Sequence, residues 1–383
     1  MDVKGKPGVP TLRGILIRGT MAPEPLAAFR QVLSRCDCTD LSAQLQTETG
    51  TDTQGHFLRL RLFDATAQSW APGFDTMALA HRLGLHPFDQ TADLLREIVI
   101  TLLMSPVNLE FPSIDEFESA VLIRRNSVLA AHKTSLAFET AKANRPPRYW
   151  TYKEGAGYTL NPGQDLIEAL VTATQPEISG QQYSFSCYRA TEYILLQSIA
   201  LELQRSHPAL LQGLQALWTQ RAVMSAEFHD VFLRELGSIA NPLPALYYVP
   251  GDRVWFRNPD EASADATGFE GSWVMYLGSG LFNNFWNHTK PYSLAEKCVE
   301  IYHWRHGLYQ DAQGAARIDE ERIKPLIQET LNQPEELARV MALMTRWREA
   351  RGVYTLNGGC MDTSREFARW VRPGSSDMPI PKT

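Results

Sequence analysis

The hydrophobic pattern of this chain changes from helical to strand-like near residue 245, and this change constrains the fold class most. Before that point apolar residues recur at helical spacings, most clearly over residues 113–143 and 193–203. Residues 245–287 are instead aromatic and β-branched around glycine turns, which is typical of antiparallel strands. Helical patterns return at 293–306 and 319–348. This order predicts an α+β fold.

Shorter patterns predict the remaining elements. Ser113, followed by Asp115 and Glu116, is the expected N-cap of the long helix. Residues 36–56 are rich in Thr, Gln, Asp and Gly, which indicates a loop of low order. We further expect strands at 12–18 and 56–63, a hairpin at 149–160, and helices at 24–33, 76–104, 165–174 and 208–235. Within the β-rich region we expect a hairpin of 245–250 with 252–257 and strands at 272–277 and 281–287.

Length and charge exclude several classes of protein. The 383 residues can bury a large core, and no repeat or clear linker divides them, so residues 1–383 are expected to form one elaborated domain. The net charge of −6 argues against a nucleic-acid partner. No segment has the roughly 18 uninterrupted apolar residues of a membrane span. The N-terminus lacks the apolar core of a secretory signal, so we expect a cytoplasmic start, with signal-independent export left open.

The five cysteines stand in different contexts, and only one has the context of a nucleophile. Their odd number does not suggest a disulfide framework. Cys36 and Cys38 lack a nearby second Cys or His pair, so a loop or helix end is favoured over a metal site. Cys298 fits the core face of a helix, and Cys360 follows two glycines as an incidental thiol. Cys187 stands where a serine-rich stretch meets a helical run, and free N–H groups and the helix dipole favour its thiolate there.

Four stretches together resemble a known family, the small bacterial protein-glutamine gamma-glutamyltransferases, or transglutaminases, associated with spore coats. The stretches are Leu122 to Ala131 with Tyr149-Trp150, Phe185-Ser186-Cys187, Pro250 to Pro259, and Gly271 to Gly278. Gly14 to Gly19 also resembles the opening strand of that family. The likeness reaches to about residue 325. Residues 36–110 are then a family-atypical insertion, parts of 206–244 are extra material, and 326–383 are a C-terminal helical extension and tail.

The resemblance implies a papain-like core, with the cysteine at a helix N-terminus packed on a small antiparallel sheet. It implies acyl transfer from protein glutamine through a Cys187 thioester. A lysine amine then gives an isopeptide cross-link, or water gives deamidation. The partners would be proteins bearing glutamine and lysine, and no cofactor or metal is expected. The chain departs from the family at two carboxylates, because Ser186 and Ser272 occupy those positions. Serine has no useful basicity near neutral pH.

Two residues are candidates to replace those carboxylates. Glu270 lies two residues before Ser272, so on a strand both side chains would share a face; the alternative is an exposed carboxylate at the strand end. His288 matches a family histidine that follows the fourth stretch, and would act as base with Asn284 or Asn287 orienting its ring. A packed histidine without a catalytic role is the alternative.

The remaining histidines fit packing or surface roles, and two other functions are alternatives to acyl transfer. His303 and His306 lie three residues apart on a helix, but two ligands do not define a metal site, so packing or surface roles are favoured. His132 is interpreted in the same way. Two alternative functions stay open: a transglutaminase-like binding or regulatory protein that has lost the chemistry, and a cysteine amidase or protease on the same scaffold.

Overall fold

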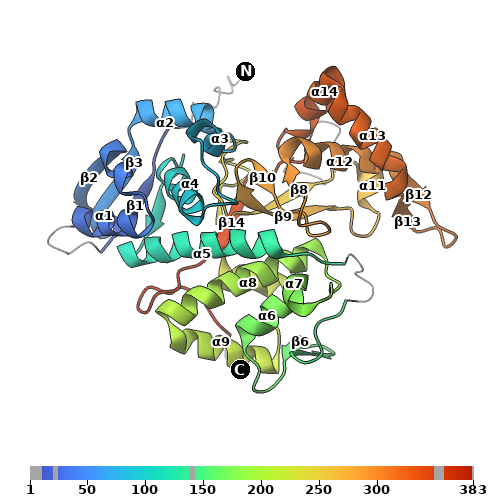
Figure 1. The fold of residues 1–383 in the computed structure, drawn as a ribbon, viewed down its shortest axis with the longest axis horizontal. Helices are drawn as coiled ribbons and strands as arrows, with labels where there is room; N and C mark the ends of the chain where they lie inside the picture. Colours follow the sequence, from blue (N-terminus) through green and yellow to red (C-terminus); the bar gives the residue numbers. More distant parts are fainter. Residues whose placement is uncertain (1–10, 20–24, 138–142, 349–357, 382–383) are drawn as a thin grey trace, which may run out of the picture.

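A computed structural model describes residues 11–19, 25–137, 143–348 and 358–381. Three groups of elements surround a central sheet: an N-terminal sheet with its helices, a helical layer containing α8, and a C-terminal group containing α12 (Figure 1). Within the described ranges, every helix is either too short or too polar to cross a membrane.

The N-terminal region forms a four-stranded sheet in the order β2-β3-β1-β4. Its strands and flanking helices are β1 Ile15–Arg18, α1 Pro25–Arg35, η1 Thr39–Gln44, β2 Leu45–Asp52, β3 Gly55–Leu62, α2 Asp64–Trp70, η2 Pro72–Phe74 and β4 Leu109–Phe111. The predicted loop over 36–56 is therefore wrong, because most of it is η1 and β2. In β2 only Leu45 is buried, so this edge strand lacks the alternation that marks a half-buried strand and is formed by pairing with β3.

Two helices connect this sheet to the rest of the protein. The single helix predicted at 76–104 is instead α3 Leu79–Leu83 and α4 Thr91–Leu103, because Gly84 ends α3 in the left-handed conformation, with φ of 64°. The long helix α5 is Ile114–Lys133, and the Ser113 hydroxyl accepts a 3.1 Å bond from the Glu116 N–H, which confirms the predicted cap. Lys133 ends α5 earlier than expected, and residues 138–142 lie outside the described ranges.

The helical layer beneath α5 contains the cysteine-bearing helix α8 (Figure 1). Its elements are β5 Trp150–Lys153, β6 Gly157–Leu160, α6 Leu166–Thr174, α7 Pro176–Ser179, α8 Cys187–Ser206, α9 Pro208–Gln220 and α10 Ser225–Phe232. The predicted hairpin β5–β6 is confirmed. The predicted helix at 208–235 is two helices and a strand, because residues 221–224 interrupt it and residues from Leu233 join the central sheet.

The central sheet has the order β11-β10-β9-β8-β14-β7. Its strands are β7 Leu233–Leu236, β8 Arg253–Arg257, β9 Gly271–Gly278, β10 Leu281–Phe282, β11 Tyr292–Ser293 and β14 Arg365–Ala368. The predicted pairing of 245–250 with 252–257 is wrong: β8 pairs antiparallel with β9 instead. Residues 245–250 find other backbone partners, as when the Tyr248 N–H donates to the Thr76 hydroxyl at 2.8 Å.

The C-terminal group packs beside the β11 edge of this sheet. It contains α11 Glu261–Ala264, α12 Leu294–Gly307, β12 Leu308–Gln310, β13 Ala316–Ile318, α13 Glu320–Asn332 and α14 Pro334–Met344. The helix predicted at 319–348 is two helices, because Pro334 cannot continue α13 and begins α14. The tail then returns as β14 between β7 and β8.

Two hydrophobic cores hold these groups together. The larger core contains α4, α5, α6 and α8, whereas the smaller one contains Tyr248, Tyr276 and Phe282 of the central sheet region with Cys298 and Ile301 of α12. Helix α8 packs on α5, α6 and β9. The predicted α+β fold is confirmed, with the cysteine at a helix start against an antiparallel sheet.

Candidate active site

Cys187 is the first residue of α8, and the local sequence fixes this helix start. The Ser186 hydroxyl caps the helix by accepting a 3.2 Å bond from the Arg189 N–H. Phe185 is fully buried and meets the Tyr193 ring edge to face, with centroids 5.0 Å apart. The buried ring before the cap and the packed ring about two turns later hold the thiol in one place.

The thiol opens into a cavity of about 570 Å³, hereafter the Cys187 cavity. It lies between the start of α8, the start of β9, and helices α12 and α13. Its lining residues are Cys187, Gly268, Phe269, Gly271, Ser272, Asn284, Trp286, Asn287, Tyr292, Glu296, Lys297, Glu300, Trp304, Glu320, Ile323, Lys324, Ile327, Gln328 and Leu331. Four aromatic and five charged side chains line the cavity, a mixture that can both desolvate a bound side chain and fix its polar groups.

Burial and nearby donors act in opposite directions on the thiol. Burial raises the pKa of Cys187 above its ordinary value. The Trp273 N–H, the Lys297 ammonium, the Tyr188 N–H and the Arg253 guanidinium each lower that pKa, in this order of size, without reversing the effect of burial. The resting group is therefore a thiol at neutral pH, surrounded by donors that favour its thiolate.

Lys297 is a buried cation on the wall of this cavity. Its side chain is 4% exposed, and its Nζ lies 2.6 Å from an oxygen of Glu300 and 3.7 Å from the centroid of the Tyr292 ring. Burial lowers the pKa of Lys297, but Glu300, Tyr292 and Cys187 raise it by more, so the net shift is upward. The ammonium therefore remains charged at neutral pH.

Arg253 is a second cation near the thiol, but it lies beneath the site. It is 1% exposed, packs on the rings of Trp273 and Tyr188, and forms an ion pair with Glu366. Its Nε donates to the Thr191 hydroxyl at 2.8 Å. Since Arg253 does not line the cavity, it supports the thiol electrostatically without facing a substrate.

Glu192 is a buried carboxyl on α8, one turn beyond the thiol. Burial raises the pKa of Glu192 to about 7, although Arg189, 2.5 Å away, favours its ionised form. Neither Glu192 nor Arg189 lines the Cys187 cavity. Glu192 therefore pairs with Arg189 in the first two turns of α8 and does not face the cavity.

The structure does not bring Glu270 or His288 into the Cys187 cavity. Glu270 precedes β9 and is exposed, and its carboxylate accepts a bond from the Gly268 N–H at 3.3 Å. His288 lies in the turn after β10, where its Nε2 is 3.9 Å from Glu177. His288 therefore faces Glu177 of α7, whereas Trp286 of the same turn lines the cavity.

The other residues proposed around the thiol also have defined positions. Asn284 accepts bonds from the Trp286 and Asn287 N–H groups, each at 3.1 Å, and so stabilises the turn instead of orienting His288. Asn284 and Asn287 both line the cavity. Of the two serines at the family's carboxylate positions, Ser272 lines the cavity and Ser186 caps α8.

The remaining candidates form separate contacts. The His303 Nδ1 lies 2.9 Å from the His306 Nδ1, and burial lowers the pKa of His303 to about 4. Cys36 and Cys38 are buried at the end of α1, and burial raises their pKa values to about 11 and about 12. Among the described residues, no group of three or more Cys, His, Asp or Glu could hold a metal ion.

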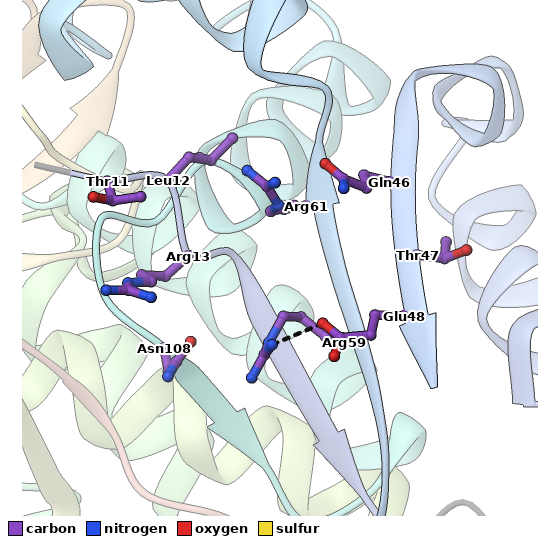
Figure 2. A pocket seen from close by; sticks show the side chains of 9 residues that line it. All are labelled: Thr11, Leu12, Arg13, Gln46, Thr47, Glu48, Arg59, Arg61 and Asn108. Carbon is purple, nitrogen blue, oxygen red and sulfur yellow. Dashed lines mark hydrogen bonds and ion pairs between the residues drawn. The ribbon is translucent and has the colours of Figure 1, made fainter. Parts of the chain in front are cut away.

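A second cavity, of about 210 Å³, lies on the N-terminal sheet (Figure 2). Figure 2 shows the side chains of Arg13, Arg59 and Arg61 around it. Arg59 pairs with Glu48 at 2.8 Å, and Arg61 pairs with Asp64 at 2.6 Å. The described residues that line this cavity include no thiol or imidazole, whereas the lining of the Cys187 cavity includes a thiol.

Sequence reasoning missed Lys297 and Glu300. A lysine between Glu296 and Glu300 on an amphipathic helix is usually interpreted as an exposed ion-pair face. The weak available signal was that Lys297 immediately precedes Cys298, a residue assigned to the core face. Only the packing of α12 beside the α8 start turns this lysine inward.

A thiol on the first residue of a helix, packed on an antiparallel sheet and open to a cavity, defines the papain-like class of cysteine proteins. The sequence model of the protein-glutamine gamma-glutamyltransferase family matches residues 80–347, and the chain therefore belongs to this family. This match includes Cys187, Ser272 and Lys297.

Solved structures were also compared with the chain. The chain is similar to a transglutaminase from Geobacillus stearothermophilus without its C-terminal extension, with 16% identity, a TM-score of 0.38, and coverage of 57% of this chain and 98% of that chain. No curated protein matches the chain. The family assignment rests on the match to the family model.

Proposed function

We propose that this protein transfers the acyl group of protein glutamine side chains to primary amines through a thioester on Cys187. The observation that carries this proposal is the position of Cys187, at the start of α8 and on the wall of an aromatic cavity, in a member of the transglutaminase family. The partners would be proteins that supply glutamine and lysine.

The chemistry has two stages. The Cys187 thiolate attacks the glutamine carbonyl carbon, the C–N bond breaks, and ammonia leaves with an added proton. An amine then attacks the thioester and forms an isopeptide bond, while Cys187 regains its thiolate. The N–H groups of Trp273 and Tyr188 point to an oxyanion site beside the sulfur, since both already favour negative charge on it.

Incorporation of a labelled primary amine into a glutamine-containing protein tests this proposal. We expect incorporation by the natural sequence and a loss on the order of ten-thousandfold in Cys187→Ala. Cys298→Ala is the matched control, because Cys298 is fully buried in the smaller core and should leave transfer intact. Equal incorporation by Cys187→Ala and the natural sequence would reject the proposal.

The two serines favour a second candidate function. Ser186 and Ser272 replace acidic residues of the resembled family, so a binding or regulatory protein without transfer activity is the alternative. It predicts binding of glutamine-containing proteins with no Cys187-dependent product. Release of ammonia without amine incorporation would indicate deamidation, and new chain termini would indicate a protease.

A further inference from the structure

We propose that Lys297 is a catalytic residue, the ammonium group that pairs with the Cys187 thiolate and donates a proton to the departing ammonia, and that Glu300 positions it. This inference rests on the proposed function. It assigns to the Cys187 cavity a cationic partner in place of the acidic residues that Ser186 and Ser272 replace.

The geometry places a buried cation on the wall of the cavity into which the nucleophile opens. Lys297 and Cys187 line the same cavity from different elements, α12 and α8. Glu300 holds the Lys297 Nζ at 2.6 Å, and the Tyr292 ring covers another side of it. An ammonium group has three N–H donors, so these two contacts leave capacity to donate within the cavity.

Other charged groups near the pair do not fill this role. Arg253 on β8 also favours the thiolate, but it lies outside the cavity and pairs with Glu366. Glu296 accepts a bond from the Ser293 N–H at 2.7 Å at the start of α12. On α13, Glu320 is exposed, and Lys324 pairs with Glu321.

In this proposal Lys297 takes part in one proton transfer in each of the two stages. In the first stage the C–S bond forms, the C–N bond breaks, and Lys297 gives one proton to the leaving nitrogen, so that ammonia departs and Lys297 becomes a neutral amine. In the second stage Lys297 takes one proton from the attacking amine as the new C–N bond forms and the C–S bond breaks. The thiolate and the ammonium are thus restored. Because the resting group is a thiol, the cycle starts from the fraction of molecules in which Cys187 has released its proton to water.

The first experiment measures ionisation of the thiol without any turnover. Iodoacetamide is uncharged, so its rate of Cys187 alkylation against pH reports the thiolate, with mass spectrometry identifying the residue. Lys297→Met should slow alkylation by roughly tenfold at neutral pH, because loss of a cation that favours the thiolate raises the pKa of the thiol by about 1 unit and so reduces its thiolate fraction. Lys297→Arg should retain most of the rate.

Glu300→Gln should change the alkylation rate in the opposite direction from Lys297→Met. Removing the carboxylate leaves the Lys297 charge unopposed, so alkylation of Cys187 should become faster. Lys153→Met is the control: Lys153 on β5 is exposed and lies outside the cavity, and its replacement should leave the alkylation profile unchanged. Because Glu300→Gln keeps Lys297, it tests the pair even if Lys297→Met fails to fold.

The second experiment separates proton donation from thiolate stabilisation. A glutaminyl peptide amide loses ammonia, which needs a proton, whereas a p-nitrophenyl ester loses an anion that does not. Lys297→Met should therefore reduce acylation by the amide at least tenfold more than acylation by the ester.

The outcomes distinguish this inference from the proposed function. An unchanged alkylation profile in both Lys297→Met and Glu300→Gln would overturn the role of Lys297, whatever the transfer activity. Equal losses on amide and ester would overturn the proton-donor role. Amine incorporation that survives Cys187→Ala would instead reject the proposed function and leave the alkylation results interpretable.

Discussion

Helices α8 and α12 both start at a serine cap and both contribute a side chain to the Cys187 cavity, but they belong to different hydrophobic cores. Helix α8 packs in the larger core with α5 and α6, while α12 packs in the smaller core with α13 and α14. Cys187 is the first residue of α8, and Lys297 is the fourth residue of α12. The site therefore forms where two separately packed units meet.

This difference separates two kinds of evidence. The thiol is marked by its own segment, because a serine-rich stretch followed by an apolar helical run is visible in the sequence. The sequence around Lys297 has no such pattern. The position of its ammonium group depends on how the smaller core packs against the larger one. Substitutions where the two cores meet should therefore affect the site more than substitutions on the exposed surface of either group.

The largest expected effect is at Glu97, a buried carboxyl of α4 that reaches the β9–β10 turn. Its carboxylate accepts a 2.8 Å bond from the Ser279 N–H, and burial raises the pKa of Glu97 to about 8. The folded protein thus holds a proton that the unfolded chain loses near pH 4.5. The contribution of Glu97 to the free energy of unfolding should therefore be full below about pH 4.5 and fall as pH rises to about 8, by up to roughly 5 kcal/mol.

Urea unfolding across pH 4.5 to 8 measures this effect. Glu97→Gln should flatten the profile, because the amide still accepts the Ser279 N–H but does not titrate. Glu321→Gln is the control, since Glu321 is exposed on α13 and should leave the profile unchanged. A Glu97→Gln profile parallel to that of the natural sequence would show that the carboxyl is not protonated in the folded protein.

The two serine caps should have smaller and nearly equal effects. Ser186→Ala and Ser293→Ala should each lower the free energy of unfolding by about 1 kcal/mol, because each hydroxyl accepts a backbone N–H at a helix start. Ser186→Asp and Ser293→Asp should restore stability, since Asp caps equally well. A loss several times larger at one serine would contradict the equivalence of the two helix starts.

The smallest effect concerns Lys324 and Glu321, which share the three-residue spacing of Lys297 and Glu300. The first pair is exposed, whereas the Lys297 side chain is 4% exposed. Lys324→Ala should leave the urea midpoint unchanged at physiological salt, because water and salt screen such pairs. A clear shift of the midpoint would show that α13 depends on this surface contact.

The elements predicted from strong local patterns agree with the structure, and the errors have physical causes. The Ser113 cap and the β5–β6 hairpin are found as expected, because caps and turns are set by a few neighbouring residues. Strand β2 was missed because an exposed edge strand needs a partner strand more than it needs apolar residues. The 245–250 segment has strand-like residues, but its hydrogen bonds go elsewhere.

The candidate site divides in the same way. Cys187 was predicted as the nucleophile, and it opens into the cavity. Glu270 and His288 were predicted from neighbouring residues and from the family resemblance, and both remain predictions whose side chains lie outside the cavity. The turn that carries His288 follows a two-residue strand, and its direction depends on packing that local spacing does not encode.

The sequence by itself determined the α+β class, the helix that starts at Cys187 and the family to which the chain belongs. Each depends on neighbouring residues or on motifs in a fixed order along the chain. Only the tertiary structure decided which groups surround the thiol. Lys297, Glu300 and Tyr292 lie more than a hundred residues away, and they reach the cavity because burial of two separate cores sets α12 against the start of α8.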